Sequence, residues 1–192
     1  MNKFVFTLAA TILGSGYALT SGAAQENAGS SNRQVFSIPP SGLDFLTGDT
    51  WIQNNQKLRL YGVQSCLRGT TYTDGAGQRQ DCGAVSLAML AALVRDTRPE
   101  CSPVAQITAS PNDSHPTVLV VCSAHIGNET VDLGTALITQ GFAFAALSND
   151  GAPVYFPYAA AEAIAKQARA GLWAYADIPH PNAVLSNVMR LK

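Results

Sequence analysis

The sequence has few charged residues, few histidines and no long hydrophobic run beyond its first part. Charged residues make up 13% of the 192 positions, about half of the usual quarter. The 12 basic side chains nearly balance the 13 acidic ones, and lysine and arginine do not cluster. Because a basic patch supplies most of the affinity for phosphate backbones, this balance counts against a nucleic acid partner. No run after residue 24 approaches the length of about 20 residues that a membrane span needs, so we expect none.

The first 24 residues have the order of a secretory signal peptide. Lys3 supplies a positive charge, residues 4–13 are mainly apolar, and small residues follow them. We expect cleavage after Ala24, with Ala18 and Ala23 as alternatives. The mature protein is therefore expected to be secreted or periplasmic.

The length of the mature chain predicts one domain. Residues 25–36 begin with a polar, small-residue stretch that predicts a flexible leader. Residues 37–180 are expected to form the domain, and residues 181–192 a C-terminal tail. This size is ordinary for a single hydrophobic core.

Four cysteines, Cys66, Cys82, Cys101 and Cys122, all lie in the mature part. An even number in an exported chain indicates disulfides, and four cysteines allow three connectivities. We favour Cys66–Cys82 and Cys101–Cys122, because each pair joins neighbours across an expected loop or hairpin. The alternative, a zinc site of four thiolates, fits poorly because no Cys-x-x-Cys pair is present.

Hydrophobic patterning predicts strands first and helices later. Residues 69–77 are polar and glycine-rich and predict a loop. The expected strands are residues 43–52 (with a turn at 47–49), 57–63, 104–109, 117–124 and 142–147, and the expected helices are 84–94, 131–140 and 158–170. Short strands joined by hairpins favour an α+β fold with a small, partly open barrel. A parallel sheet is the less favoured alternative.

Several short motifs occur in a characteristic order between residues 43 and 173. They are Thr47-Gly48-Asp49-Thr50, Arg59-Leu60-Tyr61-Gly62-Val63, Cys82-Gly83, Val131-Asp132-Leu133, Ile138-Thr139-Gln140-Gly141-Phe142-Ala143, Ala161-Glu162-Ala163 and Gly171-Leu172-Trp173. In this combination the chain resembles the staphylococcal nuclease-like (thermonuclease) family. The resemblance implies an OB-type five-stranded barrel with three helices. Active members of that family cleave DNA and RNA phosphodiesters with calcium.

The resemblance maps two site residues of the family onto this chain. Asp49 matches one calcium ligand, and Arg59 matches one of the two arginines that hold the phosphate. The alternative for Asp49 is a turn carboxylate that caps local amides. The alternative for Arg59 is a surface or ion-pair role.

The other residues that the family mechanism needs are missing. Thr47 stands where the family has an outer carboxylate. Gln64 and Leu67 replace the second calcium aspartate and the general-base glutamate, and the second arginine is absent from residues 113–117. Loss of a general base or of a phosphate clamp each lowers the rate by factors of about 10² to 10⁴. We therefore expect no ordinary nuclease mechanism and no cofactor, with Asp49 a vestigial calcium ligand.

The remaining candidate residues are weaker. His115, His125 and His180 have no metal-ligand spacing. Four aromatic residues are expected to pack in or over the core, although a binding platform is an alternative: Tyr155, Phe156, Tyr158 and Trp173. A rearranged nuclease site would have to use Asp49 and Arg59 with Asp44 or Asp113.

The sequence thus favours a non-catalytic binding or accessory domain outside the cytoplasm. Its charge balance makes a polysaccharide or a protein the better partner. Exported nuclease-like proteins that this chain resembles occur in succinoglycan-type exopolysaccharide gene clusters, which suggests an accessory role in exopolysaccharide biosynthesis. The alternatives are a secreted phosphodiesterase with a rearranged site and a structural envelope protein.

Overall fold

A computed structural model describes residues 35–39, 41–107 and 116–190, all within one compact unit that covers residues 33–192. The expected signal peptide and its cleavage site lie outside the described residues, as do Asp113 and His115. The first described strand, β1 (Phe36–Ser37), begins at the last residue of the expected leader.

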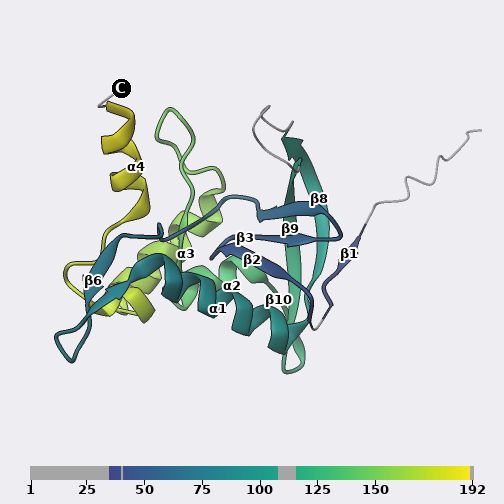
Figure 1. Ribbon diagram of the computed structural model, residues 1–192, viewed down its shortest axis with the longest axis horizontal. Coiled ribbons are helices and arrows are strands. Elements are labelled where there is room, and N and C mark those ends of the chain that lie inside the picture. Colours follow the sequence, from purple (N-terminus) through teal and green to yellow (C-terminus); the bar gives the residue numbers. More distant parts are fainter. Residues whose placement is uncertain (1–34, 40, 108–115, 191–192) are drawn as a thin grey trace, which may run out of the picture. The chain divides into compact units, whose positions relative to one another are not determined.

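The fold is α+β, and its largest element is a seven-stranded sheet that curls into a half-barrel (Figure 1). The strands follow the order β1-β8-β9-β4-β3-β2, and β10 pairs with the C-terminal end of β9. Besides β1 they are β2 (Asp44–Thr47), β3 (Thr50–Gln53), β4 (Gln56–Leu60), β8 (Glu100–Ile107), β9 (Thr117–Ile126) and β10 (Glu129–Asp132). Only the β4–β9 pair is parallel among the pairings of the described residues.

Two short two-stranded sheets complete the β structure of the described residues. β5 (Val63–Ser65) pairs with β11 (Ala143–Ala145), and β6 (Thr71–Thr73) pairs with β7 (Arg79–Asp81). The prediction of a loop over residues 69–77 is therefore wrong for β6. Its side chains are polar apart from Tyr72, which is buried against Tyr175. The strand therefore depends on this tertiary contact, and the local sequence has no apolar pattern that would predict it.

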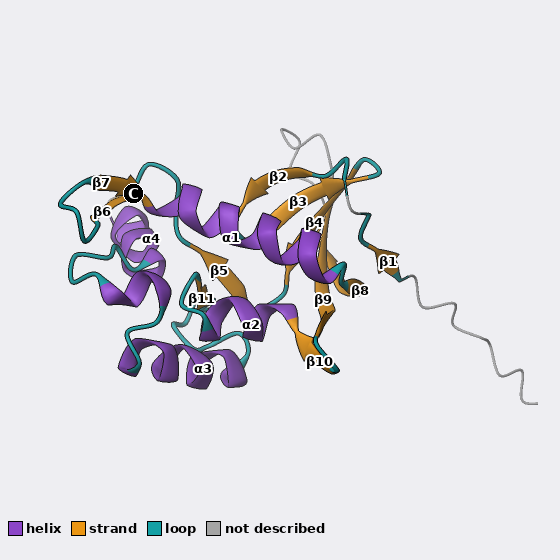
Figure 2. Cartoon of the chain, turned by 90° about the horizontal axis from the view of Figure 1, so that it is seen from below, coloured by secondary structure: helices purple, strands orange, loops and turns teal. Residues whose placement is uncertain are grey.

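The described residues form four α-helices, one more than expected (Figure 2). They are α1 (Cys82–Thr97), α2 (Leu133–Thr139), α3 (Phe156–Gln167) and α4 (Pro181–Arg190), and a 3₁₀ turn, η1, covers Gly171–Ala174. α1 begins at an Asp81 cap, whose carboxylate accepts a hydrogen bond from the amide of Ala84 at 2.8 Å. The additional helix α4 occupies the expected tail, where Asn182 donates a 2.9 Å hydrogen bond to the carbonyl of Ala145.

The core explains why the early strands form where they do. Trp51 and Leu58 face each other across β3 and β4, and both are fully buried. Between these strands, Asn54 and Asn55 have positive φ angles of 50° and 59°. A two-residue hairpin turn in which both residues have positive φ favours asparagine, which explains the Asn-Asn pair in the sequence.

Both favoured disulfides are present in the structure. Cys66 is bonded to Cys82, and Cys101 to Cys122. The second pair joins residues directly opposite each other on β8 and β9. Disulfides persist in oxidising compartments, so the structure is compatible with an extracellular location.

The helices that the structure describes are all too short or too polar to cross a membrane.

Candidate functional site

Asp49 lies in the tight turn between β2 and β3, which packs directly on α1. A Cβ atom on Gly48 would lie 2.6 Å from the Cβ atom of Ser86 in α1, so only glycine allows this close approach. The hydroxyl of Ser86 in turn donates a 2.7 Å hydrogen bond to the carbonyl of Phe142. The turn therefore holds Asp49 in a fixed, buried position, with the residue 2% exposed.

Both carboxylate oxygens of Asp49 are occupied by groups of the protein itself. Its Oδ1 accepts hydrogen bonds from the hydroxyls of Thr47 and Thr50, the latter at 2.9 Å. Its Oδ2 accepts a bond from the buried amide of Ser65 at 3.3 Å. These contacts link the β2–β3 turn to β5.

Arg59 completes this network from the neighbouring strand β4. Its guanidinium lies 3.3 Å from Oδ2 of Asp49 and donates a 3.1 Å hydrogen bond to Oε1 of Gln64. The amide of Gln64 is held in turn by a 3.0 Å bond to the carbonyl of Ser65. The Arg59 side chain is 38% exposed, so part of the guanidinium still faces solvent.

Asp49, Arg59 and Gln64 line a pocket of about 370 Å³, which we call the arginine pocket. Arg68 lines it as well and lies 4.0 Å from Asp81. Burial by itself would raise the pKa of Asp81. The amides of Ala84 and Gly69 and the charge of Arg68 outweigh this effect, so that the pKa lies below its usual value. The pocket thus presents two guanidinium groups whose partners are carboxylates of the same chain.

The residues of the arginine pocket do not fit a calcium ion. Calcium takes six to eight oxygen ligands, several of them carboxylates. The described residues that line the pocket include one carboxylate, Asp49, whose oxygens already accept three hydrogen bonds and an ion pair. No group of three or more histidine, cysteine, aspartate or glutamate side chains is close enough to hold a metal within the described ranges.

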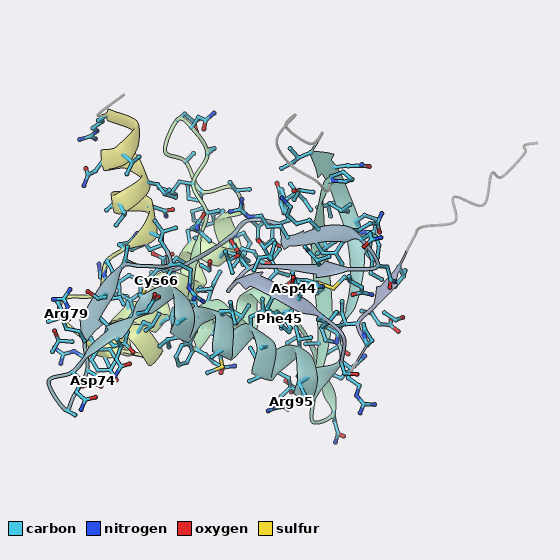
Figure 3. All side chains as sticks on the ribbon, in the orientation of Figure 1. Asp44, Phe45, Cys66, Asp74, Arg79 and Arg95 are labelled. Atoms are coloured by element: carbon cyan, nitrogen blue, oxygen red, sulfur yellow. A yellow bond between two sulfur atoms is a disulfide. The ribbon has the colours of Figure 1, made fainter. Side chains whose placement is uncertain are left out.

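The other candidate residues are not brought together with this pocket. Asp44 is exposed at the start of β2 (Figure 3) and is not among the residues that line the pocket. His125 lies 3.1 Å from the hydroxyl of Thr130, and Nε2 of His180 lies 2.9 Å from Glu162. Tyr158 is buried, whereas Tyr155 and Phe156 are 46% and 75% exposed.

A second pocket, of about 320 Å³, is one that the sequence analysis did not predict. We call it the tyrosine pocket. It is lined by Tyr61, Tyr155, Tyr158, Asp132, Val104 and Val121, among others. The sequence analysis gave Tyr155 and Tyr158 as part of an alternative binding platform, but no signal in the sequence joined them to Tyr61 or Asp132.

Comparison with protein-family models found no model that matches this chain, and comparison with curated proteins found no match either. What the fold and the site define is therefore a class: a disulfide-bonded α+β domain with a curled half-barrel sheet and a pocket that bears arginine.

Proposed function

We propose that this chain is an exported, non-catalytic member of the staphylococcal nuclease-like group, which uses the arginine pocket to bind an anionic group. One observation carries the proposal: both oxygens of the Asp49 carboxylate already accept hydrogen bonds within the protein, and Oδ2 also pairs with Arg59. A carboxylate so engaged stabilises the pocket and is poorly placed to hold calcium or to activate water.

The sheet supports the nuclease-like part of this proposal. Strands β2, β3 and β4 form an antiparallel meander, β9 adds parallel to β4, and β8 pairs antiparallel with β9. This order is compatible with a partly open OB-type barrel. The pocket lies on the β2–β3 turn and on β4 and β5, where the resemblance locates the family's site.

The pocket's charges support an anionic ligand. Arg59 and Arg68 each retain solvent exposure, and Arg68 is 57% exposed with only a long contact to Asp81. Guanidinium groups bind carboxylate, sulfate and phosphate oxygens through paired hydrogen bonds. We propose that the ligand is an acidic polysaccharide of the envelope, and that the chain acts as an accessory protein in succinoglycan-type exopolysaccharide production.

The first test is a calcium titration of the oxidised mature protein, run with cleavage assays on plasmid DNA and RNA. We expect neither calcium binding nor cleavage. Calcium-dependent cleavage that disappears in Asp49→Ala and in Arg59→Ala would show instead a nuclease with a rearranged site.

The second test measures binding of a succinylated acidic polysaccharide by titration calorimetry. Arg59→Ala and Arg68→Ala should each weaken binding about tenfold, because a charge-assisted hydrogen bond is lost. The control is Arg95→Ala, since Arg95 is exposed at the other end of α1 from the β6–β7 hairpin (Figure 3) and pairs with Asp96. Equal affinities of all four proteins would contradict the proposed role of the arginine pocket.

A further inference from the structure

The tyrosine pocket is separate from the arginine pocket, since the two have no lining residue in common. Its walls are aromatic and apolar, with the rings of Tyr61, Tyr155 and Tyr158 joined by valines of β8 and β9. The described residues that line it include no lysine, arginine or histidine. The pocket volume of about 320 Å³ falls at the small end of the range for small-molecule sites, about 300 to 1,000 Å³.

The tyrosine rings are held in place by close packing. Tyr155 and Tyr158 lie edge to face, with their centroids 4.8 Å apart and an interplanar angle of 81°. Gly62 has a φ angle of 72°, and a Cβ atom there would lie 3.1 Å from the Cβ of Tyr155. The glycine therefore lets the turn after Tyr61 approach both other tyrosines. The result is a preformed set of rings, since Tyr158 is only 3% exposed.

Asp132 supplies a carboxylate to this aromatic pocket. Its Oδ1 accepts three hydrogen bonds, from the amide and hydroxyl of Thr135 at 2.7 and 3.0 Å and from the hydroxyl of Tyr158 at 2.6 Å. Burial first, and then the hydrogen bond to Asp132, raises the pKa of Tyr158 above its usual value. The phenol therefore stays protonated and keeps donating to the carboxylate.

The second oxygen of Asp132, a residue that lines the pocket, differs from the first in its hydrogen bonds. Among the described residues, none donates a hydrogen bond to its Oδ2, and no basic side chain forms a salt bridge with Asp132. A half-buried carboxylate without a cationic partner leaves negative charge that a cation would neutralise. The negative faces of tyrosine rings attract a cation in the same way.

These features discriminate between classes of ligand. An anion would be repelled by Asp132, and a sugar would need more polar partners than this mostly apolar wall provides. Rings, valines and one carboxylate instead match a cation that carries methyl groups. We propose that the tyrosine pocket binds a small quaternary ammonium compound, with its charged head among the tyrosine rings and next to Asp132.

The test compares choline and tetramethylammonium with dimethylbutanol, the neutral carbon isostere of choline, and with glucose. Each is titrated into the oxidised mature protein and followed by proton NMR of the tyrosine rings. We expect saturable binding of the two cations and binding of the neutral alcohol at least about tenfold weaker. Equal binding of choline and its isostere would overturn the proposal, and so would saturation by glucose alone or no shift with any compound.

Variants then assign the binding to this pocket. Asp132→Asn should weaken choline binding about tenfold while it keeps a good N-cap residue for α2. Tyr155→Ala should have a similar effect, and Tyr155→Phe should retain affinity because the ring remains. The matched control is Phe156→Ala, which removes an exposed ring outside the pocket lining.

Two outcomes at this stage would contradict the assignment. One is an equal loss of choline affinity in Phe156→Ala and Tyr155→Ala. The other is a loss in Arg59→Ala, which changes only the arginine pocket. Because Tyr155 is 46% exposed, its variants should fold even if Asp132→Asn does not, so the test remains decisive. The proposal does not depend on the polysaccharide role of the arginine pocket.

Discussion

Replacing Asp49 with alanine is expected to destabilise the domain strongly, because its carboxylate is a structural acceptor. The change removes the partner of the buried Ser65 amide, whose orphaned N–H costs about 1–3 kcal/mol. It also removes the acceptor of the Thr47 and Thr50 hydroxyls, which can rotate to other partners and so cost about 1 kcal/mol together. Loss of the Arg59 ion pair adds less than about 1 kcal/mol, since Arg59 is 38% exposed.

These terms give an expected loss of about 3 kcal/mol in the free energy of unfolding. The measurement is urea denaturation of the oxidised protein at neutral pH. The slope m of the unfolding free energy against urea concentration should be the same in both proteins, as a two-state comparison of their stabilities requires. The matched control is Asp44→Ala on the neighbouring strand β2, where the exposed carboxylate should change stability by less than about 0.5 kcal/mol. A loss below about 1 kcal/mol for Asp49→Ala would refute the reasoning, and so would calcium stabilisation of the unmodified protein.

Two further predictions concern the packing around Tyr158. A Cβ on Gly134 would lie 2.4 Å from the Tyr158 hydroxyl oxygen, so Gly134→Ala should lower the free energy of unfolding by about 1–3 kcal/mol, whereas Gly75→Ala, with open space around it, should be near neutral. The raised pKa of Tyr158 means that the folded state holds this proton more tightly than the unfolded chain, where the pKa is about 10. Its contribution is therefore complete below about pH 10 and is lost as pH rises further, by at most about 1.4 kcal/mol per pH unit. Denaturation at several pH values between about 8 and 11 should show a steeper loss in the unmodified protein than in Tyr158→Phe, where the raised pKa of Tyr72 still contributes. A stability difference between the two proteins that is the same at every pH would contradict this prediction.

The order of the early strands and of the long helices followed from local signals. The Asn54-Asn55 turn, the apolar run of α1 and the glycine after α2 each act over a few residues, so the sequence could predict them. The sequence analysis missed β6 because two of its three residues are polar. It missed α4 because Pro181–Arg190 mixes apolar and polar residues over only ten positions, in a segment expected to be a tail. Long-range contacts hold both, through the Tyr72–Tyr175 ring pair and the hydrogen bond from Asn182 to Ala145.

That Gln64 and Leu67 stand where nuclease-like proteins have carboxylates remains a prediction from the sequence, because this comparison needs only residue types. What Asp49 does instead depends on distance. Ser65 and Arg59 are far enough along the chain that only the pairing of strands brings them to its oxygens. The sequence therefore left Asp49 between two roles, and the contacts of its carboxylate are the basis on which we propose the structural one.

The sequence by itself determined the covalent and local features of this protein: the favoured cysteine pairs, the main turns and the α+β class of fold. The tertiary structure alone decided which side chains share a pocket. Tyr61, Asp132 and Tyr155 come from three separate segments, and no periodicity links them. Pockets are built from such non-local contacts, and the folding of the sheet and helices creates the tyrosine pocket by bringing these segments together.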